Sequence, residues 1–367
     1  MMQACLQRKF SSDMNRNDLE QVRTFLHEYD GPEIRLMEVC GTHTASIAKN
    51  GIPALLSPAI RLISGPGCPV CVTVTDYIDR LVSLCRSPGT AVVSFGDLLR
   101  VKGSQMSLAD ARACGADVRM VYAPMQMLDF AAREPERTFV FAAVGFETTA
   151  PVYALMLEEA GRRGLRNVKL LTSLKTMPEV IRTVVRARTP DGRGRIDGFL
   201  APGHVCAVTG SSEYQQLAEE TGLPFVVSGF SGPQLLASIA AFVKLRGRGT
   251  CLNFYPEVVT DTGNAEAKAL CAKYYEPCDA SWRGLGCIPR SGLRLREEYR
   301  TLDAGSGGLD GDHAPRGCEC AKVLTGQIMP VECPLFGRVC TPQNPNGACM
   351  VSQEGSCYNW YISGRTR

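Results

Sequence analysis

Cysteine is the residue type with the most chemical potential in this chain. The 367 residues include 17 cysteines, an odd number that argues against a framework built only of disulfides. Outside an oxidising compartment, cysteines that are not buried filler are usually metal ligands or reactive thiols. Six of them lie within one short segment: Cys318, Cys320, Cys333, Cys340, Cys349 and Cys357. Their wide spacing lacks the close pairs of zinc ribbons, and it favours an iron–sulfur cluster over zinc or over buried reduced cysteines.

A Cys-x-x-Cys motif, Cys68-Pro69-Val70-Cys71, follows a predicted strand within the sequence SGPGCPVC. If a helix begins there, the positive end of its dipole stabilises a thiolate, which suits a redox dithiol or a soft-metal site. The alternatives are half of a zinc site or two incidental thiols. No second Cys-x-x-Cys occurs in the sequence, which weakens the zinc interpretation.

The sequence MEVCGTHT, residues 37–44, places Cys40 before a glycine and His43 three positions later, with Thr42 between them. A thiol beside glycine is sterically open, and the imidazole could accept its proton or share a metal. The alternative is that Cys40 is a small buried hydrophobic residue.

Two further segments carry polar groups beyond the ends of predicted strands. GFETTAP, residues 145–151, contains Glu147, Thr148 and Thr149, and PGHVC, residues 202–206, contains His204. Alternatively, Glu147, Thr148 and Thr149 could cap the following helix. His204 could be a loop histidine whose hydrogen bonds are satisfied locally. The sequence has no serine-hydrolase elbow, phosphate-binding loop or GxGxxG fingerprint, so the common nucleotide and hydrolase sites lack support.

Alternating strands and helices must position these residues. Apolar runs predict strands at Ile60–Ser64, Ala91–Phe95, Val118–Tyr122, Phe139–Val144, Val168–Thr172, Gly198–Ala201 and Phe225–Ser228. Amphipathic stretches between them, such as Thr75–Cys85, Val152–Ala160 and Pro178–Arg188, predict helices. This alternation indicates βαβ units and parallel sheets, whose carboxyl edges bind ligands. We therefore expect the α/β class, with two doubly wound parallel-sheet domains.

The expected organisation has four parts. Residues 1–31 form an N-terminal helical segment, 32–134 a first α/β domain with Cys40 and the Cys-x-x-Cys motif, and 135–250 a second α/β domain. Residues 251–367 form a C-terminal region that ends in a small irregular iron–sulfur domain. Within it, residues 303–317 are rich in Gly and Asp and predict a linker or flexible loop. The cysteine-rich tail that follows needs a metal or cluster to hold it together.

Composition excludes several classes of protein. With 40 Lys and Arg against 37 Asp and Glu, the formal charge is +3, which leaves no electrostatic footprint for nucleic acid or an anionic membrane. No apolar stretch approaches the roughly 20 residues of a membrane span, and the first residues lack a signal-peptide core. The sequence predicts a soluble, cytoplasmic protein.

Six motifs in order also carry a family resemblance. They are MEVCGTHT, SGPGCPVC, GFETTAP, APGHV, WRGLGCIP and the C-x₁₂-C-x₆-C-x₁₆-C pattern formed by Cys320, Cys333, Cys340 and Cys357. Together, over about residues 30–361, they resemble the HypD family of NiFe-hydrogenase maturation proteins. Cys206 departs from the family pattern, which has serine there, and Cys318 and Cys349 are alternative cluster ligands.

The resemblance implies a specific chemistry. Family members pair with the small protein HypC to form a scaffold on which a transient iron centre receives two cyanides and a carbon monoxide. The cyanides come from HypE, and the iron group is then delivered to the hydrogenase large subunit. The four patterned cysteines are expected to hold a 4Fe–4S cluster. No independent enzymatic turnover is assigned.

Individual roles follow from the same resemblance. Cys40 is expected to bind the iron together with a HypC cysteine, with Thr42 and His43 lining the site. Cys68 and Cys71 resemble the dithiol of ferredoxin–thioredoxin reductase, between iron and cluster. Four residues are expected to hydrogen-bond a cyanide or guide the partner: Glu147, Thr148, Thr149 and His204. The alternatives are a freestanding iron–sulfur dithiol oxidoreductase and a zinc-stapled interaction protein.

Overall fold

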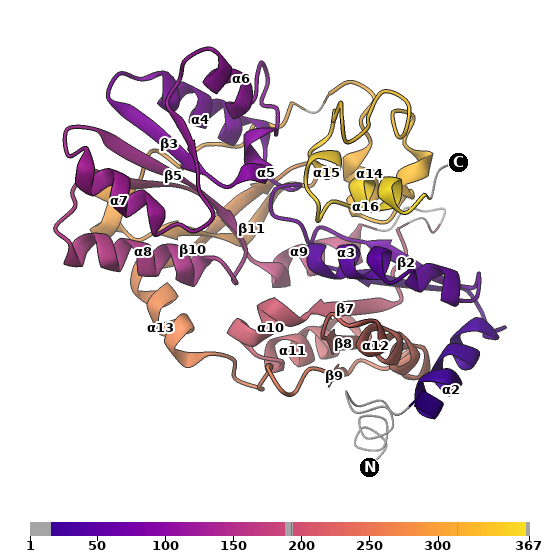
Figure 1. Ribbon diagram of the computed structural model, residues 1–367. Helices are drawn as coiled ribbons and strands as arrows, with labels where there is room; N and C mark the ends of the chain where they lie inside the picture. Colours follow the sequence, from indigo (N-terminus) through magenta and orange to yellow (C-terminus); the bar gives the residue numbers. More distant parts are fainter. Residues whose placement is uncertain (1–15, 188–191, 193, 314, 365–367) are drawn as a thin grey trace.

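The protein is an α/β structure with two separate sheets, as the computed structural model shows for residues 16–187, 192, 194–313 and 315–364 (Figure 1). The first sheet is parallel throughout, with strand order β2-β1-β7-β8-β9. Its strands are β1 (Ile34–Glu38), β2 (Ile60–Ser64), β7 (Gly198–Pro202), β8 (Phe225–Ser228) and β9 (Cys251–Asn253).

The second sheet is mixed, with strand order β10-β11-β6-β5-β3-β4. Its parallel half contains β3 (Thr90–Ser94), β4 (Val118–Met120), β5 (Thr138–Gly145) and β6 (Val168–Lys175). An antiparallel hairpin of β10 (Tyr275–Trp282) and β11 (Gly286–Leu295) adds to β6.

Helices cover the sheets and connect their strands. From the amino end to the second half of the chain they are α2 (Arg16–His27), α3 (Gly41–Lys49), η1 (Ile52–Leu55), α4 (Thr75–Arg86), α5 (Gly96–Leu99), α6 (Leu108–Ala113), α7 (Gln126–Arg133), α8 (Ala150–Arg162) and α9 (Met177–Arg186). The remaining ones are α10 (Gly203–Thr209), α11 (Ser212–Thr221), α12 (Gly232–Leu245), α13 (Ala265–Tyr274), η2 (Glu297–Leu302), α14 (Cys320–Leu324), η3 (Pro330–Glu332), α15 (Ala348–Val351) and α16 (Ser356–Ile362). None of these described helices is long and apolar enough to cross a membrane.

The chain passes between the two sheets three times. After β2 it leaves the first sheet, builds β3 to β6 of the second, returns for β7 to β9, and crosses again to β10 and β11. Each of the expected ranges 32–134 and 135–250 therefore contributes strands to both sheets. The boundary expected between residues 134 and 135 does not separate one sheet from the other. Local alternation of strands and helices reveals the class of fold, but it carries no information on which sheet a strand joins.

All seven predicted strands are present, within a few residues at their ends. The strands β1, β9 and the hairpin β10–β11 were not predicted. Charged residues interrupt β1, β9 has only three residues, and the hairpin strands contain Pro277 and Pro289. The predicted helices correspond to α4, α8 and α9, although Arg188 lies outside the described residues. The segment 303–317, apart from the undescribed residue 314, is a packed loop: Gly311 exchanges hydrogen bonds with Asp76 at the start of α4.

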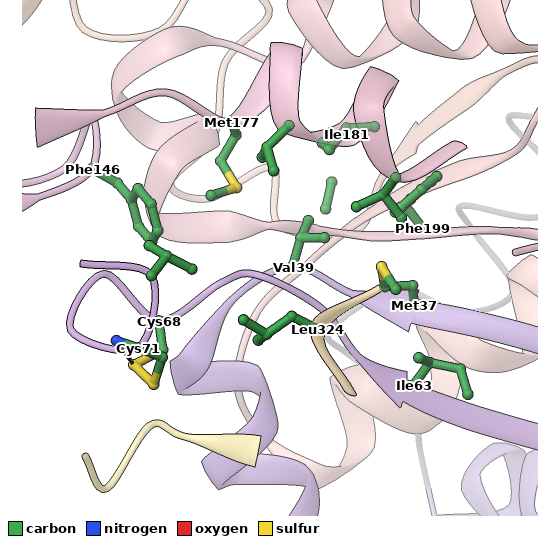
Figure 2. Packing of buried hydrophobic residues seen from close by; sticks show 14 of the residues in the cluster. Met37, Val39, Ile63, Cys68, Cys71, Phe146, Met177, Ile181, Phe199 and Leu324 are labelled. Atoms are coloured by element: carbon green, nitrogen blue, oxygen red, sulfur yellow. Dashed lines mark hydrogen bonds between the residues drawn. A yellow bond between two sulfur atoms is a disulfide. The ribbon is translucent and has the colours of Figure 1, made fainter. Parts of the chain in front are cut away.

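The cysteine-rich C-terminal region packs against both halves of the molecule. In Figure 1 its helices α14, α15 and α16, drawn in yellow, lie beside α3 and α5. One core cluster joins residues from three parts of the chain (Figure 2). Met37 and Val39 come from the end of β1, Phe146 and Met177 from the ends of β5 and α9, and Leu324 from α14. The same cluster contains the buried cysteines of the C-terminal region, so its folding is tied to the core of the α/β body.

Gly198, the first residue of β7, provides a test of this architecture. A Cβ atom there would overlap the side chain of Phe242 and the carbonyl oxygen of Pro224, neither of which can move freely. We expect Gly198→Ala to lower the free energy of unfolding by about 3 kcal/mol or more, measured by urea denaturation.

The matched control is Gly161→Ala in α8, where a Cβ meets nothing within 4 Å. That change should leave the stability equal or slightly higher, because alanine is the better helix former. Equal stabilities of the two variants would show that the packing around β7 is looser than described.

Candidate functional site

Cys40 lies at the amino end of α3, directly after β1, with 8% of its surface exposed. The loop that carries the Cys-x-x-Cys motif presses against it. A Cβ at Gly67 would overlap the backbone of Val39 and Cys40, so only glycine permits this approach. The Gly41 N–H donates to the carbonyl oxygen of Gly67 at 2.8 Å, which fixes the loop on the start of the helix.

The surroundings of Cys40 hold its thiol neutral in the free protein. Burial raises the pKa of Cys40 to about 12, although the backbone N–H groups of His43 and Thr42 partly offset this. A soft metal would therefore have to displace the proton to bind, and those N–H groups would then favour the thiolate.

Glu38, two residues before Cys40, is a feature that the sequence analysis missed. Its side chain is 3% exposed, and burial raises its pKa to about 8. One carboxyl oxygen accepts a hydrogen bond from the Thr44 hydroxyl at 2.7 Å, while the other has no partner among the described residues. The signal for it was an acidic residue that directly follows two apolar residues, Leu36 and Met37, and precedes a third, Val39, because a carboxyl in such a setting needs a specific reason to be buried.

His43 is fully buried behind Cys40. Its Nε2 atom lies 3.2 and 3.1 Å from the carbonyl oxygens of Ser228 and Gly229, so Nε2 carries the proton and Nδ1 is left without a partner among the described residues. Burial lowers the pKa of His43 to about 4, which keeps the ring neutral at physiological pH. Phe230 packs on this ring, with 4.7 Å between centroids.

His204, on α10, also stacks on Phe230, with 4.0 Å between ring centroids. The Phe230 ring therefore contacts both His43 and His204. Partial burial lowers the pKa of His204 as well. Cys206, the departure from the family pattern, is fully buried, and burial raises its pKa. It therefore behaves as a small apolar residue.

Thr42 faces the C-terminal region. Its hydroxyl donates to Glu354 Oε1 at 2.9 Å, and a Cβ at Gly41 would overlap the Glu354 side chain. Burial raises the pKa of Glu354. Sequence reasoning missed Glu354 because it belongs to no motif, yet it joins the cysteine-rich region to the helix that Cys40 begins.

Cys68 and Cys71 form a disulfide, and both are buried. They lie in a turn that ends before α4 begins at Thr75, so the expected location at a helix N-terminus is wrong. The loop between β2 and α4, which contains both cysteines, belongs to the connection that carries the chain from the first sheet to the second. Cys71 Sγ lies 4.0 Å from the carbonyl oxygen of Ala348 in the C-terminal region.

Five cysteines converge on one small pocket in that region. Its lining includes Val323, Leu335 and Phe336 together with the sulfur-bearing residues Cys318, Cys320, Cys333, Cys340 and Cys357. Cys349 is fully buried and is not part of the lining. The pocket is thus apolar and rich in thiols.

These cysteines suit a cluster by their chemistry. The Asn346 N–H donates to Cys340 Sγ at 3.3 Å, a type of contact that tunes iron–sulfur centres. Among the described residues, no three His, Cys, Asp or Glu side chains already meet as ligands of one metal ion. A cubane cluster distributes its ligands over four irons, and so needs them farther apart than a single ion does.

The remaining predicted residues lie between β5 and α8. Glu147 Oε1 accepts a hydrogen bond from the Met177 N–H at the start of α9, so it caps that helix and leaves α8 uncapped. Burial raises the pKa of Glu147 to about 8, and its Oε2 has no described partner. Thr149 donates to the carbonyl oxygen of Phe146, and Thr148 is half-buried beside it. The contacts of Glu147 and Thr149 position Phe146 and α9, and none of them involves Cys40.

Comparison with known proteins shows which family this sequence resembles. Residues 14–364 match the HypD family model, described as the hydrogenase formation hypA family. The chain is 42% identical to hydrogenase maturation factors HypD of Azotobacter vinelandii and Rhodobacter capsulatus, over 349 and 344 residues. Both alignments cover 91% of this chain and 90% of the relative. The Escherichia coli factor HypD is 41% identical over 337 residues, 89% of this chain and 88% of its own.

The match of the sequence over nearly its whole length identifies this two-sheet protein as a hydrogenase maturation factor. The chain belongs to the HypD family.

The raised pKa of Glu147 predicts a pH dependence of stability. The folded protein keeps the Glu147 proton up to a pKa of about 8, whereas the unfolded chain releases it near 4.5. Stability from this group is therefore complete at low pH and is lost as the pH rises between these values. We expect Glu147→Gln, which keeps the carbonyl acceptor, to reduce the fall in unfolding free energy between about pH 5 and 8.

The measurement is a series of urea denaturation curves across that range. Glu297→Gln, at an exposed position in η2, is the matched control and should follow the wild type. A Glu147→Gln curve that runs parallel to the wild type would contradict the assignment.

Proposed function

We propose that this chain is the scaffold on which the Fe(CN)₂CO group of NiFe hydrogenase is assembled, with Cys40 as the iron ligand. The observation that supports it is a continuous line of contacts. Gly67 joins the start of α3 to the disulfide loop, Cys71 approaches Ala348, and the neighbouring Gly347 lies against the cysteine pocket. A Cβ at Gly347 would come within 2.7 Å of Cys320 Sγ and 2.9 Å of Cys318 Sγ.

The residues around Cys40 suit iron as the substrate. A soft thiolate is the preferred protein ligand for low-spin iron with cyanide and carbonyl ligands, and a buried site excludes water and oxygen. The neutral His43 and the hydroxyl of Thr42 lie on the same helix. Phe230 packs against the rings of both His43 and His204, which holds these side chains in place beside the helix that Cys40 begins.

The cysteine pocket would hold a 4Fe–4S cluster through Cys320, Cys333, Cys340 and Cys357, with Cys318 as the alternative ligand. Such a cluster supplies single electrons at low potential. The Cys68–Cys71 disulfide would take up two electrons and two protons to become two thiols, and the reverse step would return them. Once reduced by electrons from the cluster, the dithiol would lie between Cys40 and the pocket and could pass those electrons on to keep the iron in its lower oxidation state.

Partners complete the site in this proposal. HypC would contribute the second cysteine ligand of the iron, HypE would supply the cyanides, and the hydrogenase large subunit would receive the finished group. Thr148 and His204, which reach the surface, would orient the partner, whereas the buried Glu147 positions α9. Assembly would take place in the cytoplasm, where thiols are kept reduced.

Infrared spectroscopy tests the role of Cys40. The chain is co-produced with HypC and HypE and purified without oxygen. We expect cyanide and carbonyl stretching bands in the wild type and their loss in Cys40→Ser, because a hydroxyl is a poor ligand for soft low-spin iron. Cys114→Ser, at an exposed cysteine, should keep the bands. Bands of normal intensity in Cys40→Ser would refute the assignment of Cys40.

Iron and acid-labile sulfide analysis tests the cluster. We expect Cys357→Ser to lose most of both, because a cubane that loses one thiolate becomes labile. Cys85→Ser in α4 is the matched control, since Cys85 is also buried but does not line the pocket. Zinc without sulfide in the wild type would favour the zinc-stapled alternative, and loss of iron in Cys318→Ser alone would change the ligand set.

A second function, a freestanding dithiol–disulfide oxidoreductase, is favoured by the disulfide between Cys68 and Cys71. It predicts that the isolated chain reduces a protein disulfide and that the double variant Cys68→Ser/Cys71→Ser does not. The scaffold proposal predicts that the double variant fails in maturation while the isolated wild-type chain has no such activity.

A further inference from the structure

A cavity of about 820 Å³ lies away from the cysteine site, in the second sheet. It forms because β11 pairs with β6 only at the last two residues of β6, Leu174 and Lys175. Towards the start of β6 the two strands diverge, and the loop 303–310 takes the place of a strand. The Thr172 N–H donates to Ser306 Oγ at 2.8 Å, and Ala304 N–H donates to the carbonyl oxygen of Leu170.

The size and walls of this cavity suit a small polar molecule. Small-molecule sites typically enclose about 300–1,000 Å³. Hydroxyl groups of Thr172, Ser173, Ser281 and Ser306 line it, together with the glycine-rich turn at residues 307–308. A cavity that served only as imperfect packing would be apolar and much smaller.

Lys175 is the exceptional residue in the lining. It is 3% exposed, and its Nζ has one hydrogen-bond partner among the described residues, Ser173 Oγ at 3.2 Å. The ring of Trp282 lies 5.6 Å away. No described carboxylate forms an ion pair with Lys175, although an ammonium has three donors to satisfy. Lysine is almost never buried without a counter-charge.

The acidic residues of the lining keep their charges but form no ion pair with Lys175, because each carboxylate has another partner. Glu276 pairs with Arg294 and Glu297 with Arg300. The other three carboxylates accept hydrogen bonds from neighbouring groups: Asp279 from the Arg290 N–H, Asp303 from Ser306, and Asp310 from the Ser281 hydroxyl.

The nearby thiol supplies no counter-charge either. Burial raises the pKa of Cys278, so this side chain is uncharged at neutral pH. Burial also lowers the pKa of Lys175 to about 8, which leaves it mostly protonated near pH 7 and in need of a counter-ion.

We propose that the cavity between β6, β11 and the loop 303–310 binds a small oxyanion, either a carboxylate or a phosphate, with the Lys175 ammonium as its counter-charge. The Ser173 hydroxyl, which accepts a hydrogen bond from Lys175, donates its own proton to another oxygen of the anion. This site is separate from the cysteine line and does not depend on the proposed role in iron assembly. Val74 and Tyr77, which follow the disulfide loop, line the cavity. An anion bound there would therefore stabilise the segment that carries the chain from the first sheet to the second.

Tryptophan fluorescence tests the proposal directly. The chain has two tryptophans, Trp282 and Trp360, so Trp360→Phe leaves the neighbour of Lys175 as the sole reporter. The full chain in this background is titrated with sodium acetate and with inorganic phosphate, and with sodium chloride at matched ionic strength. We expect a saturable change in emission with one or both oxyanions and none with chloride. Acetate alone would identify a carboxylate ligand, and phosphate alone a phosphate ligand.

Variants of two lysines on one strand complete the design. Lys175→Met and Lys175→Gln should weaken the fitted affinity by about tenfold or more, because the buried charge is lost. Lys169→Met, also on β6 but outside the cavity lining, should bind as the parent does. Unchanged titration in both Lys175 variants, an equal response to chloride, or no saturable response up to about 50 mM of either oxyanion would overturn the proposal.

Discussion

The close approach of Gly67 to the backbone of Cys40 is the constraint on which the cysteine site depends. Any side chain at Gly67 would separate the disulfide loop from the start of α3. Because the approach is backbone to backbone, it fixes the positions of two reactive centres without using either sulfur for support. The C-terminal region adds a second constraint through Glu354, which contacts Gly41 and Thr42.

The path of the chain explains why the disulfide loop lies where it does. Residues 65–74 form the first crossing between the sheets, so Cys68 and Cys71 are held by both of them. Arg283, in the turn between β10 and β11, donates to the carbonyl oxygen of Thr73 and thereby ties this hairpin of the second sheet to the first crossing. A loop anchored in this way is rigid where a surface loop would be mobile, and rigidity serves a site that must hold sulfur atoms in line.

Much of the fold and of the cysteine site could be predicted from the sequence. The features that could not be predicted share one physical reason. Apolar runs located seven strands, and the motifs located Cys40, His43 and the cysteine pocket, because these signals are local. The exchange of strands between sheets, the cap that Glu147 provides to α9, and the contact of Thr42 with Glu354 join residues far apart in the chain. Neither spacing nor composition records such pairings, and Lys175 was missed because a lysine ending a strand is ordinarily exposed.

The central pairing of the first sheet has a consequence for the birth of the protein on the ribosome. β1 pairs with β7, and Arg35 bonds to Asp197 across a separation of 162 residues. At synthesis rates of about 5–20 residues per second, Cys40 and Cys68 emerge roughly 7 to 30 seconds before β7, which pairs with β1. During that interval their thiols are open to stray metals and oxidants. Safe production of this factor therefore depends on a reducing, metal-buffered environment around the nascent chain as well as on the finished fold.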